Sequence, residues 1–83
     1  MMLKVFSVYD SKVKAFKFPF FMQHSGQAIR GFQDLVNDGK SEISRYPEDF
    51  TLFEHGTFDD ETGVMSSLSA PVNHGLAVVY KKG

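Results

Sequence analysis

The clearest periodic feature of the chain is one apolar stripe of helical spacing between residues 25 and 37. Its members recur mainly at intervals of three and four residues, which places them on one side of a helix. Ser25 stands before the stripe as a candidate N-cap, and Gly39 follows it as a residue able to close the helix in a left-handed conformation. A helix with one apolar side needs an apolar surface to cover. The stripe consists of Ala28, Ile29, Phe32, Leu35 and Val36.

Five other segments have the composition of strands and supply that surface. They are rich in β-branched and aromatic residues and are separated by turn residues. Their order around the helix is β-β-α-β-β-β. The sequence therefore predicts an α+β fold, a small antiparallel sheet covered on one face by a single helix, as one domain over residues 1–83. The segments are residues 3–9, 13–18, 50–58, 64–68 and 76–80.

Two linking segments carry more specific expectations. Pro19 has no N–H to donate to a ladder, so it ends the second strand or places it at a sheet edge. Residues 40–49 are polar and rich in turn formers, with Ile43 and Tyr46 as the side chains expected to anchor them on the core. Residues 69–75 are expected to be a connection.

Length and cysteine content limit the class of protein. A chain of 83 residues without cysteine has no disulfide and no thiolate metal site, which is typical of a reducing compartment. No apolar run reaches the roughly 18 residues of a membrane span, and the N-terminus lacks a signal-peptide pattern. We therefore expect a soluble, intracellular protein that acts without a membrane. Its small size also favours a homodimer or higher oligomer.

Charge is unevenly distributed along the chain although the net charge is only −1. Residues 1–30 carry a balance of +4, residues 31–63 a balance of −7, and the last twenty residues add two lysines. This polarity suits two opposite faces of one molecule, or head-to-tail pairing between copies. A dedicated nucleic-acid-binding domain is usually basic overall, so the polarity alone does not predict DNA binding.

Lysines and phenylalanines alternate near the N-terminus, and two interpretations compete. The rings either fill the core, or they form a platform on which bases stack while the lysines contact phosphates. Adjacent Phe20 and Phe21 face opposite sides of an extended backbone, so one of them is expected at the surface or against another subunit. The candidate phosphate contacts are Lys4, Lys12, Lys14 and Lys17, and the candidate stacking rings are Tyr9, Phe16, Phe18 and Phe20.

The start of the helix is a second candidate contact for nucleic acid. Free N–H groups and the positive end of the helix dipole favour an anion beside Ser25 and Gly26, and Arg30 lies one turn further on. The alternative is an ordinary serine cap whose own hydroxyl satisfies those groups.

Catalytic and metal-binding patterns are not found. His24, His55 and His74 have no metal-ligand spacing, and the chain lacks the phosphate-binding loop, nucleophile-elbow and zinc-protease motifs. The acidic stretch "DDETG" lacks the alternating ligands of a calcium loop and has the composition of a turn. We expect no enzyme, no metal and no cofactor.

Three blocks of the sequence resemble the small nonstructural protein of gokushoviruses, the microvirus branch of the single-stranded DNA bacteriophages. The blocks are "VFSVYDSKV", "PFFMQHSGQAIRGFQDLVND" and "YPEDFTLFEHGTFDDETG", and the resemblance extends from about residue 3 to residue 80. It implies a nonstructural protein of the host cytoplasm that acts in replication or packaging of the single-stranded genome. It supplies no binding residues.

Together these observations favour a non-enzymatic phage accessory protein that binds single-stranded DNA weakly and without sequence preference. The alternative is a protein-binding adaptor, or a self-assembling scaffold, that makes no DNA contact and acts through the acidic residues 48–61 on viral or host replication proteins.

Overall fold

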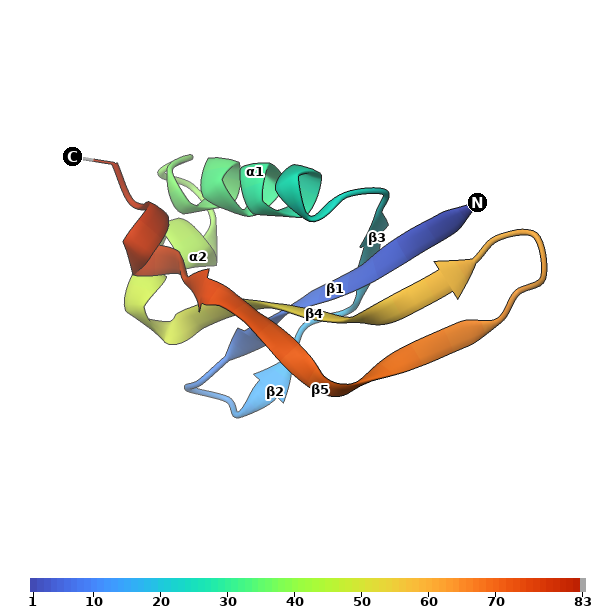
Figure 1. The fold of residues 1–83 in the computed structure, drawn as a ribbon. Coiled ribbons are helices and arrows are strands. Elements are labelled where there is room, and N and C mark those ends of the chain that lie inside the picture. The colour runs from blue at the N-terminus through green and yellow to red at the C-terminus, as the bar shows by residue number, and fades with distance from the viewer. Residues whose placement is uncertain (83) are drawn as a thin grey trace.

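The computed structural model describes residues 1–82, in which a five-stranded antiparallel sheet carries one long helix on one face (Figure 1). The strand order is β2-β1-β4-β5, and β3 pairs with β1 beside β2. The predicted α+β class, an antiparallel sheet covered by a single main helix, is therefore confirmed. The strands are β1 (Met2–Asp10), β2 (Ala15–Phe16), β3 (Phe20–Met22), β4 (Phe50–Asp59) and β5 (Met65–Leu76). The helices are α1 (Ser25–Val36), α2 (Glu42–Arg45) and the 3₁₀ turns η1 (Pro47–Asp49) and η2 (Ala77–Tyr80).

Strand β1 lies at the centre of the fold because other strands pair with both of its edges. It pairs with β4 on one side and with β2 and β3 on the other. Four consecutive residues, Val5 to Val8, are buried, which explains why the sequence alternates only loosely there.

Helix α1 covers the sheet through the predicted apolar stripe. Ala28, Phe32 and Val36 are buried and Ile29 packs against the core, while Leu35 at the margin keeps 43% of its surface exposed. The periodicity of the sequence therefore predicted the buried side of the helix correctly. The core joins these residues to Phe6, Val8, Ile43, Phe50, Leu52 and Ala77.

The ends of α1 differ in how well they were predicted. His24, not Ser25, is the N-cap, and the Gln27 side chain accepts a hydrogen bond from the His24 N–H at 3.1 Å. Ser25 is already inside the helix, so its prediction as the cap was wrong. At the other end Gly39 has the expected positive φ of 70° after the C-cap Asn37.

The second predicted strand is much shorter than residues 13–18. Lys14 takes a left-handed φ of 58°, which interrupts the extended backbone and leaves Ala15–Phe16 as β2. The chain stays beside β1, with the Lys17 N–H donating to the Val8 carbonyl at 2.8 Å. Beyond Pro19 it pairs with β1 again as β3, a strand that the sequence did not predict.

The C-terminal prediction was wrong in two places. Residues 69–75 belong to strand β5, which bulges at two points against β4. Residues 77–80 form η2 instead of a strand, because Gly75 adopts a φ of 114° and redirects the chain toward α1. There Ala77 is fully buried and the Tyr80 ring lies 6.0 Å from the Phe32 ring.

Residues 40–49 form α2 and η1 at the same end of the molecule as η2 (Figure 1). The Ser41 hydroxyl caps α2 by accepting from the Ser44 N–H at 3.1 Å. Ile43 anchors the segment in the core as predicted, but Tyr46 remains 52% exposed and does not.

Candidate nucleic-acid interface

The face of the sheet opposite α1 carries a cluster of aromatic side chains, and no helix among residues 1–82 covers it. In β4, Phe50 and Leu52 point into the core, so Phe53, which follows Leu52, points the other way. Tyr9 of β1 also points away from the core, since it directly follows the core residue Val8. Phe16 is paired with Tyr9 in the strand register, which brings it to this face.

The rings of this cluster contact one another closely. The Tyr9 and Phe16 centroids lie 4.8 Å apart, and those of Phe16 and Phe53 lie 5.5 Å apart at an interplanar angle of 72°. Phe16 is the most open of the three, with 46% of its surface exposed. We call Tyr9, Phe16, Phe53 and His55 the aromatic platform.

His55 completes the platform through a hydrogen bond to a buried serine. Its Nε2 lies 2.6 Å from the Ser7 hydroxyl, and its ring lies 5.2 Å from that of Phe16. Ser7 is only 2% exposed, so this hydrogen bond ties the imidazole to a fixed point of the sheet. Phe53 and His55 were not among the candidates predicted from sequence, although the alternation after Phe50 places both of them opposite the core.

A second aromatic pair extends the same face along β1. Phe21 is paired with Val5 and Phe58 with Leu3, and the Phe21 and Phe58 rings are 5.6 Å apart. Four residues of β1 separate Val5 from Tyr9, or about 13 Å along the strand. The open face therefore presents two aromatic groups in line.

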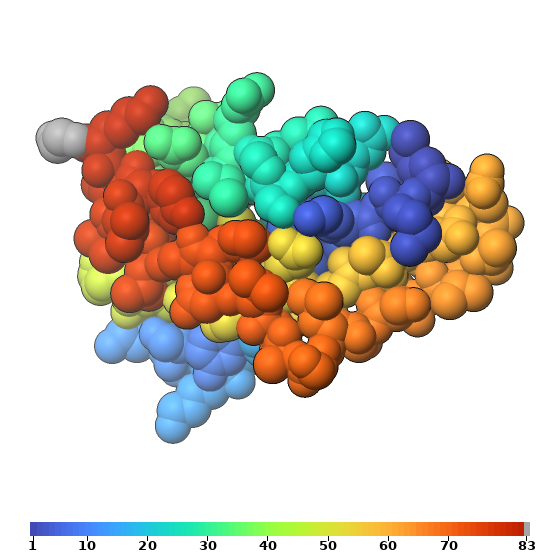
Figure 2. Space-filling view, in the orientation of Figure 1, coloured from blue at the N-terminus to red at the C-terminus, as the bar shows by residue number. Residues whose placement is uncertain are grey.

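The candidate lysines do not share this face. Lys4 donates to the Ser25 hydroxyl at 3.2 Å and pairs with Glu54 at 3.7 Å, on the side of the sheet that α1 covers. Lys17 pairs with Glu42 at 3.3 Å and lies 5.4 Å above the Phe50 ring. Lys12 and Lys14 remain exposed in the turn between β1 and β2, which protrudes in light blue in Figure 2.

The other candidates are also dispersed. Phe20 stacks on Phe6 at 5.8 Å and packs against the core, whereas Phe18 is 93% exposed at the sheet edge. The Ser25 hydroxyl donates to Glu54 at 3.3 Å, so a carboxylate already occupies the region beside the helix start. Gly26 and Arg30 are exposed on α1, on the opposite side of the sheet from the platform. Of the residues predicted from sequence, the structure brings Tyr9 and Phe16 together in the platform, and Phe16, Lys17 and Phe18 line a shallow hollow at the sheet edge.

Glu54 is the centre of a polar network that joins α1 to the sheet. Burial alone raises the pKa of Glu54, but hydrogen bonds from His74 and Ser25 and the charge of Lys4 outweigh it and hold the pKa below its ordinary value. The His74 Nε2 lies 2.9 Å from the Glu54 Oε1.

This lowered pKa predicts acid sensitivity. The Glu54 carboxylate stabilises the fold at pH values above the ordinary pKa of 4.5, and its contribution is lost as the pH falls through the lower folded value. Urea denaturation between pH 3 and pH 7 should show a smaller acid loss for Glu54→Gln than for the wild-type protein. Equal losses in the two proteins would show that other carboxylates, such as Asp38 and Asp59, control the acid response.

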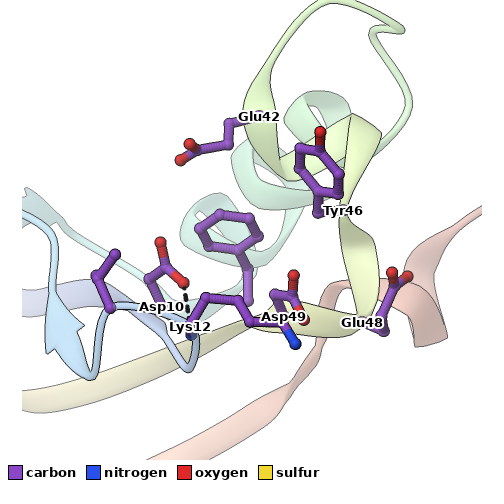
Figure 3. A pocket seen from close by; sticks show the side chains of 8 residues that line it. Asp10, Lys12, Glu42, Tyr46, Glu48 and Asp49 are labelled. Carbon is purple, nitrogen blue, oxygen red and sulfur yellow. Dashed lines mark hydrogen bonds between the residues drawn. The ribbon is translucent and has the colours of Figure 1, made fainter.

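A pocket of about 460 Å³ lies beside the β1–β2 turn, away from the platform. Figure 3 shows Glu42 and Tyr46 on one side of it and Asp10 and Lys12 on the other, with the Lys12 N–H donating to the Asp10 carboxylate at 2.9 Å. Glu48 and Asp49 complete its acidic rim. The pocket is suited to a cationic group because carboxylates outnumber amines in its lining.

Residues 1–82 show neither a metal-binding cluster nor a membrane-spanning helix. No group of three histidine, aspartate or glutamate side chains is arranged to hold a metal ion there. No helix in that range is both long and apolar enough to span a bilayer.

Comparison with known proteins establishes the family. The model of the phage ORF5 protein family matches residues 3–78, which is most of the chain. The chain belongs to the phage ORF5 protein family. A curated relative, Protein ORF5 of Chlamydia phage 1, is 34% identical over 87 aligned positions, covering 94% of this chain and 81% of the relative.

The match to a gokushovirus protein confirms the resemblance found in the three sequence blocks. This phage ORF5 protein is accordingly a phage accessory protein. No solved structure matches it.

Proposed function

We propose that this phage ORF5 protein binds single-stranded DNA, weakly and without sequence preference, on the open face of its sheet. The observation that supports this is the aromatic platform, in which rings in mutual contact lie on a sheet face that α1 leaves uncovered. Such a face matches the general arrangement in which bases stack on sheet-borne aromatic rings. The step served is replication or packaging of the viral genome in the host cytoplasm.

The chemistry of the platform explains the absence of sequence preference in this proposal. Every base has a π face, and stacking on an aromatic ring contributes about 1–3 kcal/mol per base whatever the base is. The platform side chains are hydrocarbon rings, a phenol and an imidazole already bonded to Ser7. They offer few groups to read the edges of bases.

The electrostatic contribution is expected to be small. Lys4 and Lys17 are held by Glu54 and Glu42, which leaves Lys12 and Lys14 in the β1–β2 turn as the candidate lysines outside these ion pairs. Two phosphate contacts give a slope of about −1.4 for the logarithm of the binding constant against the logarithm of salt concentration on a single strand. Binding should therefore be weak but tolerant of salt.

This expectation can be measured by fluorescence anisotropy with a labelled oligothymidine across a salt series. Lys14→Asn removes one charge and tolerates the left-handed backbone, so it should reduce the slope by about 0.7. Lys17→Gln is the matched control and should leave the slope unchanged. No binding at low salt would overturn the proposed function, and a slope much steeper than about −1.4 would place the DNA on another surface.

The acidic pocket supports a second candidate function, the protein-binding adaptor. Its rim includes Glu48 and Asp49 of the acidic segment predicted from sequence, and its exposed Tyr46 adds an aromatic wall beside Arg45. A basic side chain of a viral or host protein is the ligand that these groups would recognise. A protein that binds no oligonucleotide but retains a lysine-rich peptide would favour this candidate.

A further inference from the structure

Phe21 and Phe58 form a second pair of rings on the open face of the sheet, beyond the aromatic platform. Their centroids lie 5.6 Å apart at an interplanar angle of 52°, and Phe21 keeps 42% of its surface exposed. Phe20 and Met22, the neighbours of Phe21 in β3, pack against the core, so the Phe21 ring points away from α1. In contact and in exposure the pair resembles Phe16 and its neighbours in the platform.

The surface between the two groups carries small side chains. In the strand registers Phe21 and Gly56 both pair with Val5, and Phe53 pairs with Ser7, so these residues share the open face. Val5 and Ser7 are both buried, and Gly56 has no side chain. A ligand that lies along β1 can therefore reach both groups without a bulky side chain between them.

The carboxylates of β1 and β4 lie on the other face of the sheet. Asp10 and Glu54 are each paired with a core phenylalanine of the neighbouring strand, so both point to the side of α1. Asp59 follows Phe58 directly and alternates to that same side. A phosphate backbone on the open face therefore meets no carboxylate of these two strands. This favours a nucleic acid over a basic protein segment as the ligand, because a basic segment would find no countercharge there.

We propose that Phe21 and Phe58 are a second stacking subsite for the same DNA strand that stacks on the platform. The inference rests on the proposed function and deepens it, because it assigns a ligand length. Four residues of β1 separate the two groups, or about 13 Å. A stacked single strand advances about 3.4 Å per nucleotide, so the two groups receive bases about four nucleotides apart, and fewer where the strand is extended.

This geometry specifies the ligand as a single strand that contacts the protein over up to about five nucleotides. A dinucleotide reaches one group only, because a single nucleotide step is much shorter than the separation of the groups. Once one base is stacked on the platform, the linked bases are held close to the second pair of rings at a high effective concentration. Affinity should therefore rise by roughly 5- to 150-fold between two and five nucleotides, and little beyond that length.

NMR titration with oligothymidines of two to ten nucleotides tests the subsite, since it also detects weak binding of the shortest ligands. Phe21→Leu keeps an apolar side chain beside Phe58 but removes the ring. It should lose most of the rise with length while its affinity for the dinucleotide stays unchanged. Tyr46→Leu is the matched control and should behave like the wild type, because it removes a ring that is 52% exposed but lines the acidic pocket. The spectrum of each variant shows that it is folded.

The outcomes separate this inference from the proposed function. A wild-type affinity that does not rise beyond two nucleotides would overturn the second subsite, as would a Phe21→Leu variant with the length dependence of the wild type. In either case the platform remains the binding surface if Phe16→Ala weakens binding of the dinucleotide. No binding at any length would overturn the proposed function, and the second subsite with it.

Discussion

Replacement of Phe16 by alanine should weaken binding of this phage ORF5 protein to a short oligothymidine by roughly 5- to 150-fold. Phe16 is the central ring of the platform, in contact with the rings of Tyr9, Phe53 and His55. Loss of one stacking surface removes about 1–3 kcal/mol of binding free energy, which corresponds to that range. Anisotropy titration at a single salt concentration measures the change.

Phe18→Ala is the matched control for this experiment. Both positions carry an exposed phenylalanine on the same short segment of the sheet edge, but it is Phe16 that contacts the platform rings. Phe18→Ala removes a ring of the same size without removing a platform contact, so it should change oligonucleotide affinity much less than Phe16→Ala. Equal affinities for the wild type and Phe16→Ala would contradict the platform as the DNA-binding surface.

The helix and its buried side could be predicted from sequence because local and tertiary forces agree there. The apolar stripe from Ala28 to Val36 has one period, and the same residues that favour the helix also fill the core. Strands β1 and β4 could be predicted for a similar reason, since their β-branched and aromatic residues are buried where the two strands pair.

The C-terminal turn and the shortened hairpin depend on information that composition does not contain. Residues 77–80 have the composition of a strand, yet Gly75 redirects them and contact with α1 makes them a 3₁₀ turn. Similarly, the strand pattern of residues 13–18 is broken by the left-handed Lys14. In both places the conformation of a single residue outweighs the preference of its neighbours for a strand.

The candidate site was predicted only in part because a one-dimensional pattern does not show which charges are already paired. Lys4 and Lys17 look available in the sequence, but Glu54 and Glu42, from distant segments, reach them in the fold. Phe53 and His55 come to the platform by the same long-range pairing of β4 with β1. Sheet register, more than composition, therefore determines the site.

Gly56 is the residue at which that register is most sensitive to substitution. It follows the β4 bulge at His55, which has no partner in either register, and a Cβ there would overlap the Ser66 carbonyl oxygen of β5. Backbone atoms on both strands would have to separate, since neither is the end of a flexible side chain. The bulge is also what allows His55 to reach Ser7 on the open face.

Gly56→Ala should therefore lower the free energy of unfolding by about 3 kcal/mol or more, measured by urea denaturation. A domain of this length has about 4–12 kcal/mol in total, so the variant would be close to unfolding at 37 °C. Gly31→Ala is the control, because its Cβ meets no atom within 4 Å and alanine favours the helix, so its stability should not fall. A loss below about 1 kcal/mol for Gly56→Ala would mean that β4 and β5 pair in another register, and His55 would then have no fixed place on the platform.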